Sequence, residues 1–147
     1  MHFSLTNEMM REIIMDHYQN PRNRRETDDP SYETVYMDSV SCIDKIYIQV
    51  KIKDGIFQDV CWHGKGCAIS TASTSIMSEL LKGKTVEEGN RIIDNYYAMI
   101  HGKEYDPDLL DEAVVFMNTG RQPSRIKCAT ISFRGVRKIL GGSDDEQ

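Results

Sequence analysis

The chain has 147 residues, of which 39% are hydrophobic and 28% are charged, and its formal net charge is -5 at pH 7. This length is typical of one domain, and we expect a single domain over residues 1–147. No apolar run approaches the roughly 20 residues that cross a bilayer, which argues against a membrane protein. An acidic chain repels phosphate backbones, so nucleic acid is not an expected partner. The N-terminal segment contains Glu8 and lacks the pattern of a secretory signal, which predicts a cytoplasmic protein.

The first 33 residues predict one helix and one exposed connection. Apolar residues at helical spacing, Met10, Ile13, Ile14 and Tyr18, predict an amphipathic helix from Thr6 or Asn7 to the Asn20-Pro21 pair. Residues 21–33 are polar and contain two prolines, so we expect an exposed loop. This loop contains a basic cluster, Arg22, Arg24 and Arg25. We interpret these side chains as solvated, and docking of an acidic partner is the alternative.

The middle of the chain predicts three antiparallel strands. In residues 45–53, isoleucines and a valine alternate with polar residues, the period of a half-buried strand. Asp54-Gly55 predicts a two-residue hairpin turn, followed by a strand over 56–63 with Ile56, Gln58, Val60 and Trp62 on one face. A less regular run over 34–41 predicts the third strand, so we expect a sheet over 34–63.

The remainder predicts a helical part over 67–140. A helix from Cys67 to Gly83 has one apolar stripe, and a capping box at Thr85 to Glu88 begins another that ends before Gly102. Weaker helical periodicity covers 108–117, a last helix runs from about 124 to 140, and residues 141–147 form a frayed tail. This order predicts an α+β fold in which helices pack on one face of a three-stranded antiparallel sheet.

The four cysteines carry the chemical signal. In a reducing compartment they should not persist as disulfides, which favours metal ligation or thiol chemistry. Cys42, Cys67 and Cys128 lie at element boundaries in polar or basic surroundings, which favour thiolates, whereas Cys61 lies within a strand and is expected to pack. With Asp44 the three supply four ligands, the number that zinc prefers. The chain has no CxxC pair, so the residues alone leave both core packing and metal binding open.

Several stretches, read in order, resemble a known family. REIIMDHYQNPRN, SCIDKI, GKGCAISTASTSIM, HGKEY and RIKCATIS are similar to SufU-type members of the NifU N-terminal family, over about Met9 to Leu140. The interval between Cys67 and Cys128 is longer than in the IscU scaffold branch. Lys127 stands where the scaffold branch carries a histidine. The LPPVK-like motif of the scaffold branch is absent from this sequence. These details favour the SufU branch.

The resemblance implies a metal site and a reaction. It implies that Cys42, Asp44, Cys67 and Cys128 bind zinc and that Cys42 also accepts sulfur from a SufS-like cysteine desulfurase, whose histidine replaces Cys42 on the metal. The chain is then a sulfurtransferase-type sulfur acceptor rather than a stand-alone enzyme. It passes sulfur to a downstream iron–sulfur scaffold or apo-protein, and Arg125 assists near the site.

One departure from the family and two other functions stay open. The family reads Cys-Gly-Asp where this chain has Ile43 in the middle, and a β-branched residue disfavours positive φ, so Asp44 could be aimed differently here. The same ligands could hold iron or a transient [2Fe–2S] cluster, which makes the chain a scaffold. In a third interpretation zinc only stabilises an interaction domain. His17 is interpreted as partly buried or solvated, and His63 as near the site.

Overall fold

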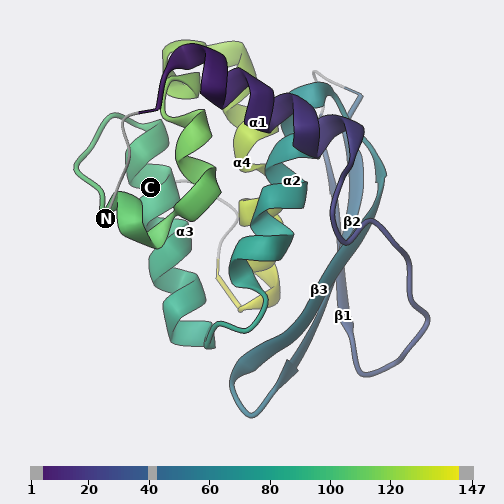
Figure 1. Cartoon of the computed structure of the whole chain (residues 1–147). Coiled ribbons are helices and arrows are strands. Elements are labelled where there is room, and N and C mark those ends of the chain that lie inside the picture. The colour runs from purple at the N-terminus through teal and green to yellow at the C-terminus, as the bar shows by residue number, and fades with distance from the viewer. Residues whose placement is uncertain (1–4, 40–42, 143–147) are drawn as a thin grey trace.

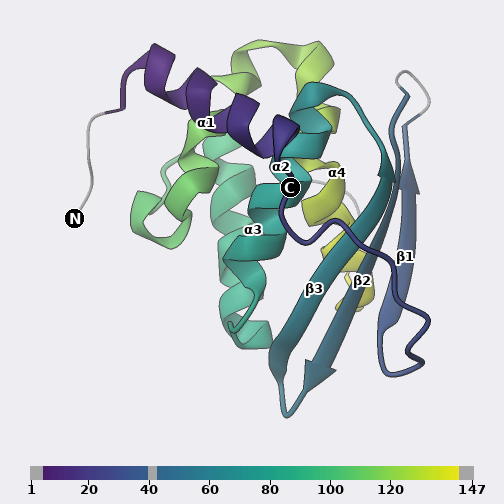
Figure 2. The same ribbon diagram turned by 45° about the vertical axis from the view of Figure 1, so that its right-hand side comes forward.

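The computed structural model describes residues 5–39 and 43–142. A three-stranded antiparallel sheet forms one layer, and the helices pack on one face of it (Figures 1 and 2), so the predicted α+β fold class is confirmed. The elements in chain order are α1 (Asn7–Gln19), β1 (Glu33–Asp38), β2 (Lys45–Lys53), β3 (Ile56–Lys65), α2 (Ala68–Leu81), α3 (Val86–Ile100), the 3-10 helices η1 (Pro107–Leu109), η2 (Asp111–Phe116) and η3 (Thr119–Arg121), and α4 (Pro123–Ile139). In these described ranges no helix is long and apolar enough to cross a membrane.

The sheet has the order β1-β2-β3, with β2 at its centre. The alternation predicted for β2 holds at Ile46, Ile48 and Val50, which are fully buried, but Gln49 on the other face is buried too, because it bonds to the backbone of Thr27. Asp54 and Gly55 both have positive φ, 55° and 72°, as a two-residue turn that matches the twist of its strands requires. The hydrophobic pattern and the turn chemistry therefore agree on the β2–β3 hairpin.

A β-bulge changes which face of β3 is buried near the hairpin. Lys51 pairs with Asp59 and Ile52 pairs with Phe57, so Gln58 is an extra residue between two registered pairs. Phe57 is fully buried and Gln58 is exposed. The prediction that Gln58 shares the inward face is therefore wrong, because one inserted residue reverses the alternation.

Helix α2 is the centre of the helical layer, packed against α1, α4 and β3. Every residue from Ser70 to Leu81 except Glu79 is buried. The residues of the predicted stripe are buried or packed against the core, and other elements cover the opposite side of α2 as well. Hydroxyl groups on that side bond to backbone carbonyls of the same helix, as Thr74 does to Ser70 at 2.7 Å, and so they can be buried.

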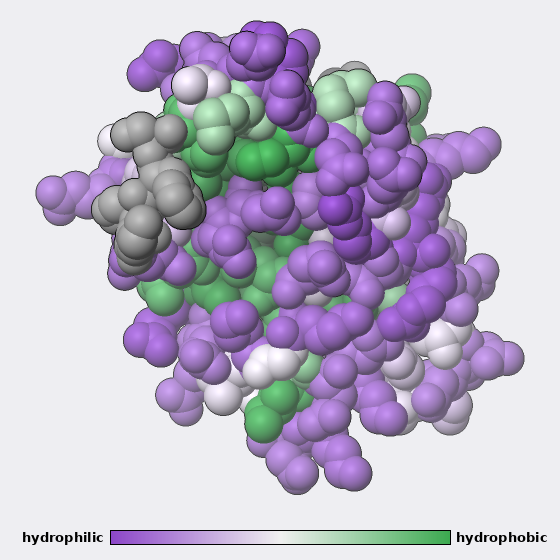
Figure 3. All heavy atoms as spheres, viewed as in Figure 1, coloured by the Kyte–Doolittle hydropathy of each residue, from purple (hydrophilic) through white to green (hydrophobic). Residues whose placement is uncertain are grey.

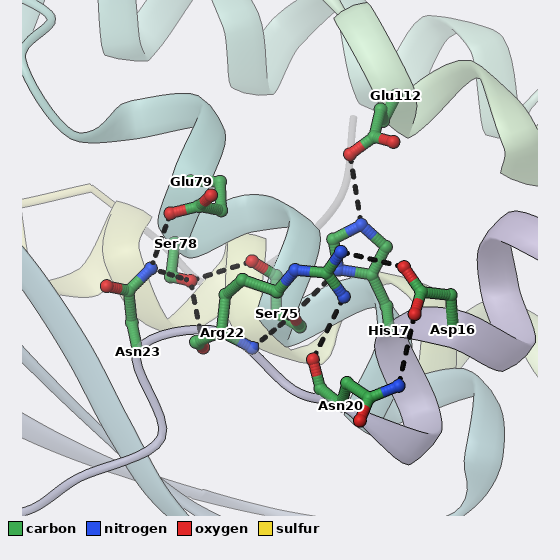
Figure 4. A network of polar contacts seen from close by, with 9 residues as sticks. All are labelled: Asp16, His17, Asn20, Arg22, Asn23, Ser75, Ser78, Glu79 and Glu112. Atoms are coloured by element: carbon green, nitrogen blue, oxygen red, sulfur yellow. Dashed lines mark hydrogen bonds and ion pairs between the residues drawn. The ribbon is translucent and has the colours of Figure 1, made fainter.

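Helix α1 is attached to α2 by a polar network centred on His17 (Figure 4). The His17 ring is 1% exposed, with Nδ1 2.8 Å from Ser75 Oγ and Nε2 3.0 Å from Glu112 Oε1. A carboxylate can only accept, so we assign the proton to Nε2, and Nδ1 then accepts from the Ser75 hydroxyl. Ser75 Oγ in turn accepts from the backbone N–H of Arg22 at 2.8 Å. His17 is thus a fully bonded core histidine and not a solvated one.

The connection between α1 and β1 is exposed, as predicted, and Arg24 and Arg25 of its basic cluster are exposed with it, although all three arginines also bond to groups of the protein. Arg22 binds Asp16, Arg24 donates to the carbonyl of Gly64, and Arg25 binds Asp59. The guanidinium groups therefore anchor this loop to α1 and β3. Sequence periodicity gave no sign of these contacts, because each arginine's partner is a carboxylate or carbonyl brought near by the fold.

Asp59 gathers three donors, from Arg25, Tyr32 and Lys82. Burial alone would raise its pKa, but these bonds outweigh burial and lower the pKa from 3.8 to about 2. A lowered folded-state pKa contributes stability above the unfolded-state pKa, and that stability is lost as pH falls through the folded-state pKa. We therefore expect Asp59→Asn to lower the free energy of unfolding by about 2 kcal/mol at neutral pH. In urea unfolding, the difference from the wild type should shrink between about pH 4 and about pH 2. Asp28→Asn, an exposed change in the connection that contains Arg25 and Tyr32, is the control. A difference that persists at about pH 2 would contradict the assignment.

The segment predicted as a helix over 108–117 forms the short 3-10 helices η1 and η2 instead. Asp111, the first residue of η2, has φ of 47°, a left-handed conformation that an α-helix cannot continue through. The flanking helices follow the sequence more closely. The capping box of α3 is present with both of its bonds between Thr85 and Glu88, and α4 begins at Pro123, one residue before the predicted start.

Candidate metal centre

Three of the four predicted ligands lie together at the end of the sheet where β1 leads into β2. The start of α2 lies beside this end (Figures 1 and 2). One ligand atom from each of Asp44, Cys67 and Cys128 lies within 4.8 Å of the other two. Asp44 is 1% exposed and Cys128 is 6% exposed, while Cys67 is half-buried. The cluster therefore opens towards solvent on the Cys67 side. Cys42, the fourth predicted ligand, lies outside the described residues.

Cys67 and Asp44 are held together by the start of α2. Cys67 is the N-cap residue, and its Sγ accepts the backbone N–H of Ser70 at 3.4 Å. The backbone N–H of Cys67 donates to Asp44 Oδ1 at 3.0 Å, which ties the start of β2 to the start of the helix. Unpaired N–H groups and the positive end of the helix dipole favour negative groups at this position. The start of α2 therefore brings a thiol and a carboxyl group together at a position that favours negative charge.

Cys128 reaches the cluster from α4, the helix furthest along the chain. It lies in the second turn of α4, and its carbonyl accepts the Ser73 hydroxyl at 3.3 Å. That bond joins α4 to α2 beside the cluster. Packing of α4 on α2 and β1, rather than any local motif, therefore sets the position of the third ligand.

Ile43, at the position of the family glycine, does not disturb Asp44. Ile43 follows directly after residues 40–42, which lie outside the described residues. Its side chain is 68% exposed. The carboxylate of Asp44 still reaches the cysteines, which answers the concern that this turn needs a glycine to aim it.

Four cations flank the cluster: Lys45, Lys65, Arg125 and Lys127. All four are exposed, and each lies within three residues of a cluster member in the sequence. None of them forms an ion pair with an acidic side chain of residues 5–39 and 43–142. These four positive charges thus lie close in sequence to the three ligand candidates. Arg125, one helical turn before Cys128, belongs to this group.

The other cysteine and the nearby histidine take structural positions. Cys61 is fully buried in β3, its Sγ lies 4.0 Å from Gln49 Oε1, and burial raises the pKa of its thiol. A neutral buried thiol agrees with the prediction that Cys61 packs. His63 stacks on Tyr47 with ring centroids 4.7 Å apart. It does not join the cluster formed by the described ligands.

One residue of the cluster's surroundings was missed by the sequence analysis. Ser70 lies three residues after Cys67, the spacing of an N-cap and its N3 residue, and this spacing was the available signal. Its side chain is fully buried and touches both Cys67 and Asp44.

A surface groove of the described residues lies away from the cluster. The groove, of about 760 Å³, runs between α1, α3 and the η1–η2 segment. Its walls are largely apolar, with Ile13, Ile92 and Val115 among them, and Figure 3 shows apolar surface gathered in the hollow on this side of the molecule. No cluster residue lines it. Ligand chemistry rather than cavity size therefore marks the candidate site.

The fold and the cluster together define a small α+β domain with a candidate thiolate–carboxylate metal site. The chain belongs to the NifU-like N terminal domain family, whose model matches residues 9–107. The predicted family resemblance is thus confirmed.

Two curated relatives match nearly the whole chain. It is 37% identical to the zinc-dependent sulfurtransferase SufU of Bacillus subtilis, over 92% of this chain and 94% of that protein. It is 30% identical to the iron–sulfur cluster assembly scaffold protein IscU of Streptococcus pyogenes, over 100% of this chain and 92% of that protein.

Solved structures agree on the fold. FiSufU of Fervidobacterium islandicum AW-1, a candidate iron–sulfur cluster assembly scaffold for the SUF system, superposes with a TM-score of 0.82 at 28% identity, over 86% of this chain and 93% of that one. The N-terminal part of a NifU-like protein from Brucella abortus gives a TM-score of 0.80 at 20% identity, over 88% of this chain and 90% of that one, a likeness of fold alone.

Proposed function

We propose that this protein is a zinc-dependent sulfur carrier that accepts persulfide sulfur from a cysteine desulfurase for iron–sulfur cluster assembly. The observation that carries the proposal is the meeting of Asp44, Cys67 and Cys128, with ligand atoms within 4.8 Å of one another. The name of the Bacillus subtilis relative, a zinc-dependent sulfurtransferase, supports the same activity.

The donor set fits zinc. Zinc–sulfur distances near 2.3 Å in a tetrahedron place ligand atoms roughly 3.8 Å apart, so the three groups need to close by only about 1 Å. Cys42, two residues before Asp44 in the sequence, is the proposed fourth ligand. When bound, zinc keeps its thiolate ligands deprotonated without redox chemistry of its own, and a carboxylate among them makes the site more labile than four thiolates.

The proposed chemical step is sulfur exchange at Cys42. Its thiolate attacks the terminal sulfur of the cysteine persulfide on the desulfurase. A sulfur–sulfur bond forms to Cys42 as the donor's sulfur–sulfur bond breaks, and the electron pair leaves with the donor cysteine as a thiolate. The exchange needs no outside oxidant or reductant. Asp44, Cys67 and Cys128 hold the site together while Cys42 reacts, and Lys45 and Lys127 favour the anion.

The proposed partners follow from this step. Upstream is a SufS-like cysteine desulfurase, and downstream is an iron–sulfur scaffold or an apo-protein that takes the sulfur. Free thiols persist in a reducing compartment, so we place the protein in the cytoplasm.

The test measures alanine formation by the desulfurase at saturating cysteine, with zinc-loaded protein or its Cys42→Ala variant. We expect the wild type to raise the rate well above that of the desulfurase alone, because removal of the persulfide frees the enzyme for another turnover. Cys42→Ala should give no increase. Cys61→Ala, a change at a buried cysteine outside the cluster, should stimulate like the wild type. Equal stimulation by Cys42→Ala would overturn the carrier proposal.

A scaffold role is the second candidate, because several matching relatives bear the name of a scaffold protein. The test is anaerobic incubation of the metal-free protein with ferrous iron and sulfide. A stable visible absorption spectrum of a [2Fe–2S] cluster, lost in Cys67→Ala, would favour the scaffold, whereas a colourless protein that stimulates the desulfurase favours the carrier.

A further inference from the structure

The hydroxyl of Ser70 lies between two proposed ligands. Ser70 Oγ donates to Asp44 Oδ1 at 2.7 Å and lies 3.4 Å from Cys67 Sγ. Its side chain is fully buried, as is nearly all of Asp44. A buried hydroxyl that binds a buried carboxylate forms a charge-assisted hydrogen bond, stronger than one between neutral groups.

The backbone leaves room for this contact at Gly66. A Cβ on Gly66 would lie 2.3 Å from Ser70 Oγ and 3.1 Å from Asp44 Oδ1. Any side chain at this position would therefore push Ser70 or Asp44 away. The missing side chain thus allows the start of α2 to approach the start of β2 closely enough for the hydroxyl to reach the carboxylate.

The two donors to Asp44 converge on the same oxygen. Oδ1 accepts from the backbone N–H of Cys67 at 3.0 Å and from Ser70 Oγ at 2.7 Å. A carboxylate oxygen has two lone pairs, so both of those on Oδ1 are engaged. A metal ion is then directed to the other oxygen, Oδ2.

We propose that Ser70 is a positioning residue that fixes Asp44 and Cys67 as a preformed pair of metal ligands. The inference rests on the proposed function and concerns the same site. The pair is held by contacts within the protein, so it keeps its geometry before the metal binds. It also keeps that geometry when Cys42 leaves the metal to take up sulfur. Residues that orient metal ligands typically contribute 10- to 100-fold to affinity.

The test compares Ser70→Ala with Ser132→Ala. Ser70→Ala removes the hydroxyl but keeps the backbone N–H that binds Cys67 Sγ, so the helix cap is preserved. Ser132, in α4, is also fully buried, and its hydroxyl has no hydrogen-bond partner in the described part of the chain. Both variants lose one buried hydroxyl group, but the hydroxyl of Ser132 does not bond to Asp44, Cys67 or Cys128.

Zinc affinity is measured by competition with a chromophoric chelator, and ligand geometry by the visible spectrum of the cobalt(II) form. We expect Ser70→Ala to bind zinc about 10- to 100-fold more weakly, with altered cobalt bands. Ser132→Ala should match the wild type in both. Thermal unfolding of the metal-free proteins checks that each variant folds.

Three outcomes overturn the proposal in distinguishable ways. Unchanged zinc affinity and cobalt bands in Ser70→Ala show that the hydroxyl only packs, and they leave the carrier function intact. Equal losses in both variants show a general effect of removing a buried hydroxyl. Failure of the wild type itself to bind zinc overturns the zinc assignment, and the role of Ser70 with it.

Discussion

Replacing Cys128 by alanine is expected to weaken zinc binding by roughly a hundred- to a thousandfold. Structural zinc sites bind with an apparent free energy of about 10–16 kcal/mol, so each of four ligands accounts for roughly 2.5–4 kcal/mol. Cys128 is the ligand candidate that attaches α4 to the cluster, and no other cysteine, histidine or carboxylate of the described residues joins the group to replace it. Zinc content after dialysis against a chelator, together with the competition affinity, measures the effect.

Cys61→Ala is the matched control for Cys128→Ala. Both residues are buried cysteines, so both variants lose a similar packing volume. Cys61 lies within β3 and outside the cluster, so its replacement should leave zinc affinity unchanged and lower the stability by about 1 kcal/mol at most. Zinc retention by Cys128→Ala at wild-type affinity would show that this cysteine only packs, and the ligand set would have to be revised.

Replacing Gly64 by alanine is expected to lower the free energy of unfolding by about 3 kcal/mol or more. Gly64 has φ of 121°, a region that residues with a Cβ rarely adopt, and an added Cβ would lie 2.1 Å from the carbonyl oxygen of Lys45. The clash is with backbone, so relief requires β2 and β3 to separate beside Asp44. Urea unfolding measures the loss, and weaker zinc binding should accompany it because Asp44 moves with β2.

Gly55→Ala separates backbone strain from this clash. Gly55 also has positive φ, 72°, but nothing lies within 4 Å of the Cβ position. Only the conformational penalty of about 1–2 kcal/mol applies there. Equal costs at the two glycines would contradict the close approach of Gly64 to Lys45.

The local elements of this protein could be predicted from sequence where the signal is carried by neighbouring residues. The strand 45–53 and its Asp54-Gly55 turn were predicted with the observed bounds, because alternation and turn chemistry act over two to four residues. The capping box at Thr85 was predicted for the same reason. The bulge at Gln58 and the left-handed Asp111 were missed, since each depends on how a segment is fitted to its neighbours.

The surroundings of α2 show what only packing decides. Its serines and threonines from Ser70 to Ser78 are buried together with its apolar residues, because α1 and α4 pack against the same helix. The same packing pairs His17 with Ser75 and Glu112, residues far apart in the sequence. The periodicity of a helix sequence shows which of its faces is apolar. It does not show which other elements pack against the remaining faces.

By itself the sequence determined the candidates for the chemistry: three cysteines and an aspartate at predicted element boundaries, within motifs that resemble one family. The tertiary structure decided that Asp44, Cys67 and Cys128 meet, because only the docking of α2 and α4 at one end of the sheet brings a strand start, a helix cap and a later helical turn within 4.8 Å. It also decided that Ser70 belongs with them. A hydroxyl binds a carboxylate only at hydrogen-bond distance, and the fold, not the sequence interval, sets that distance.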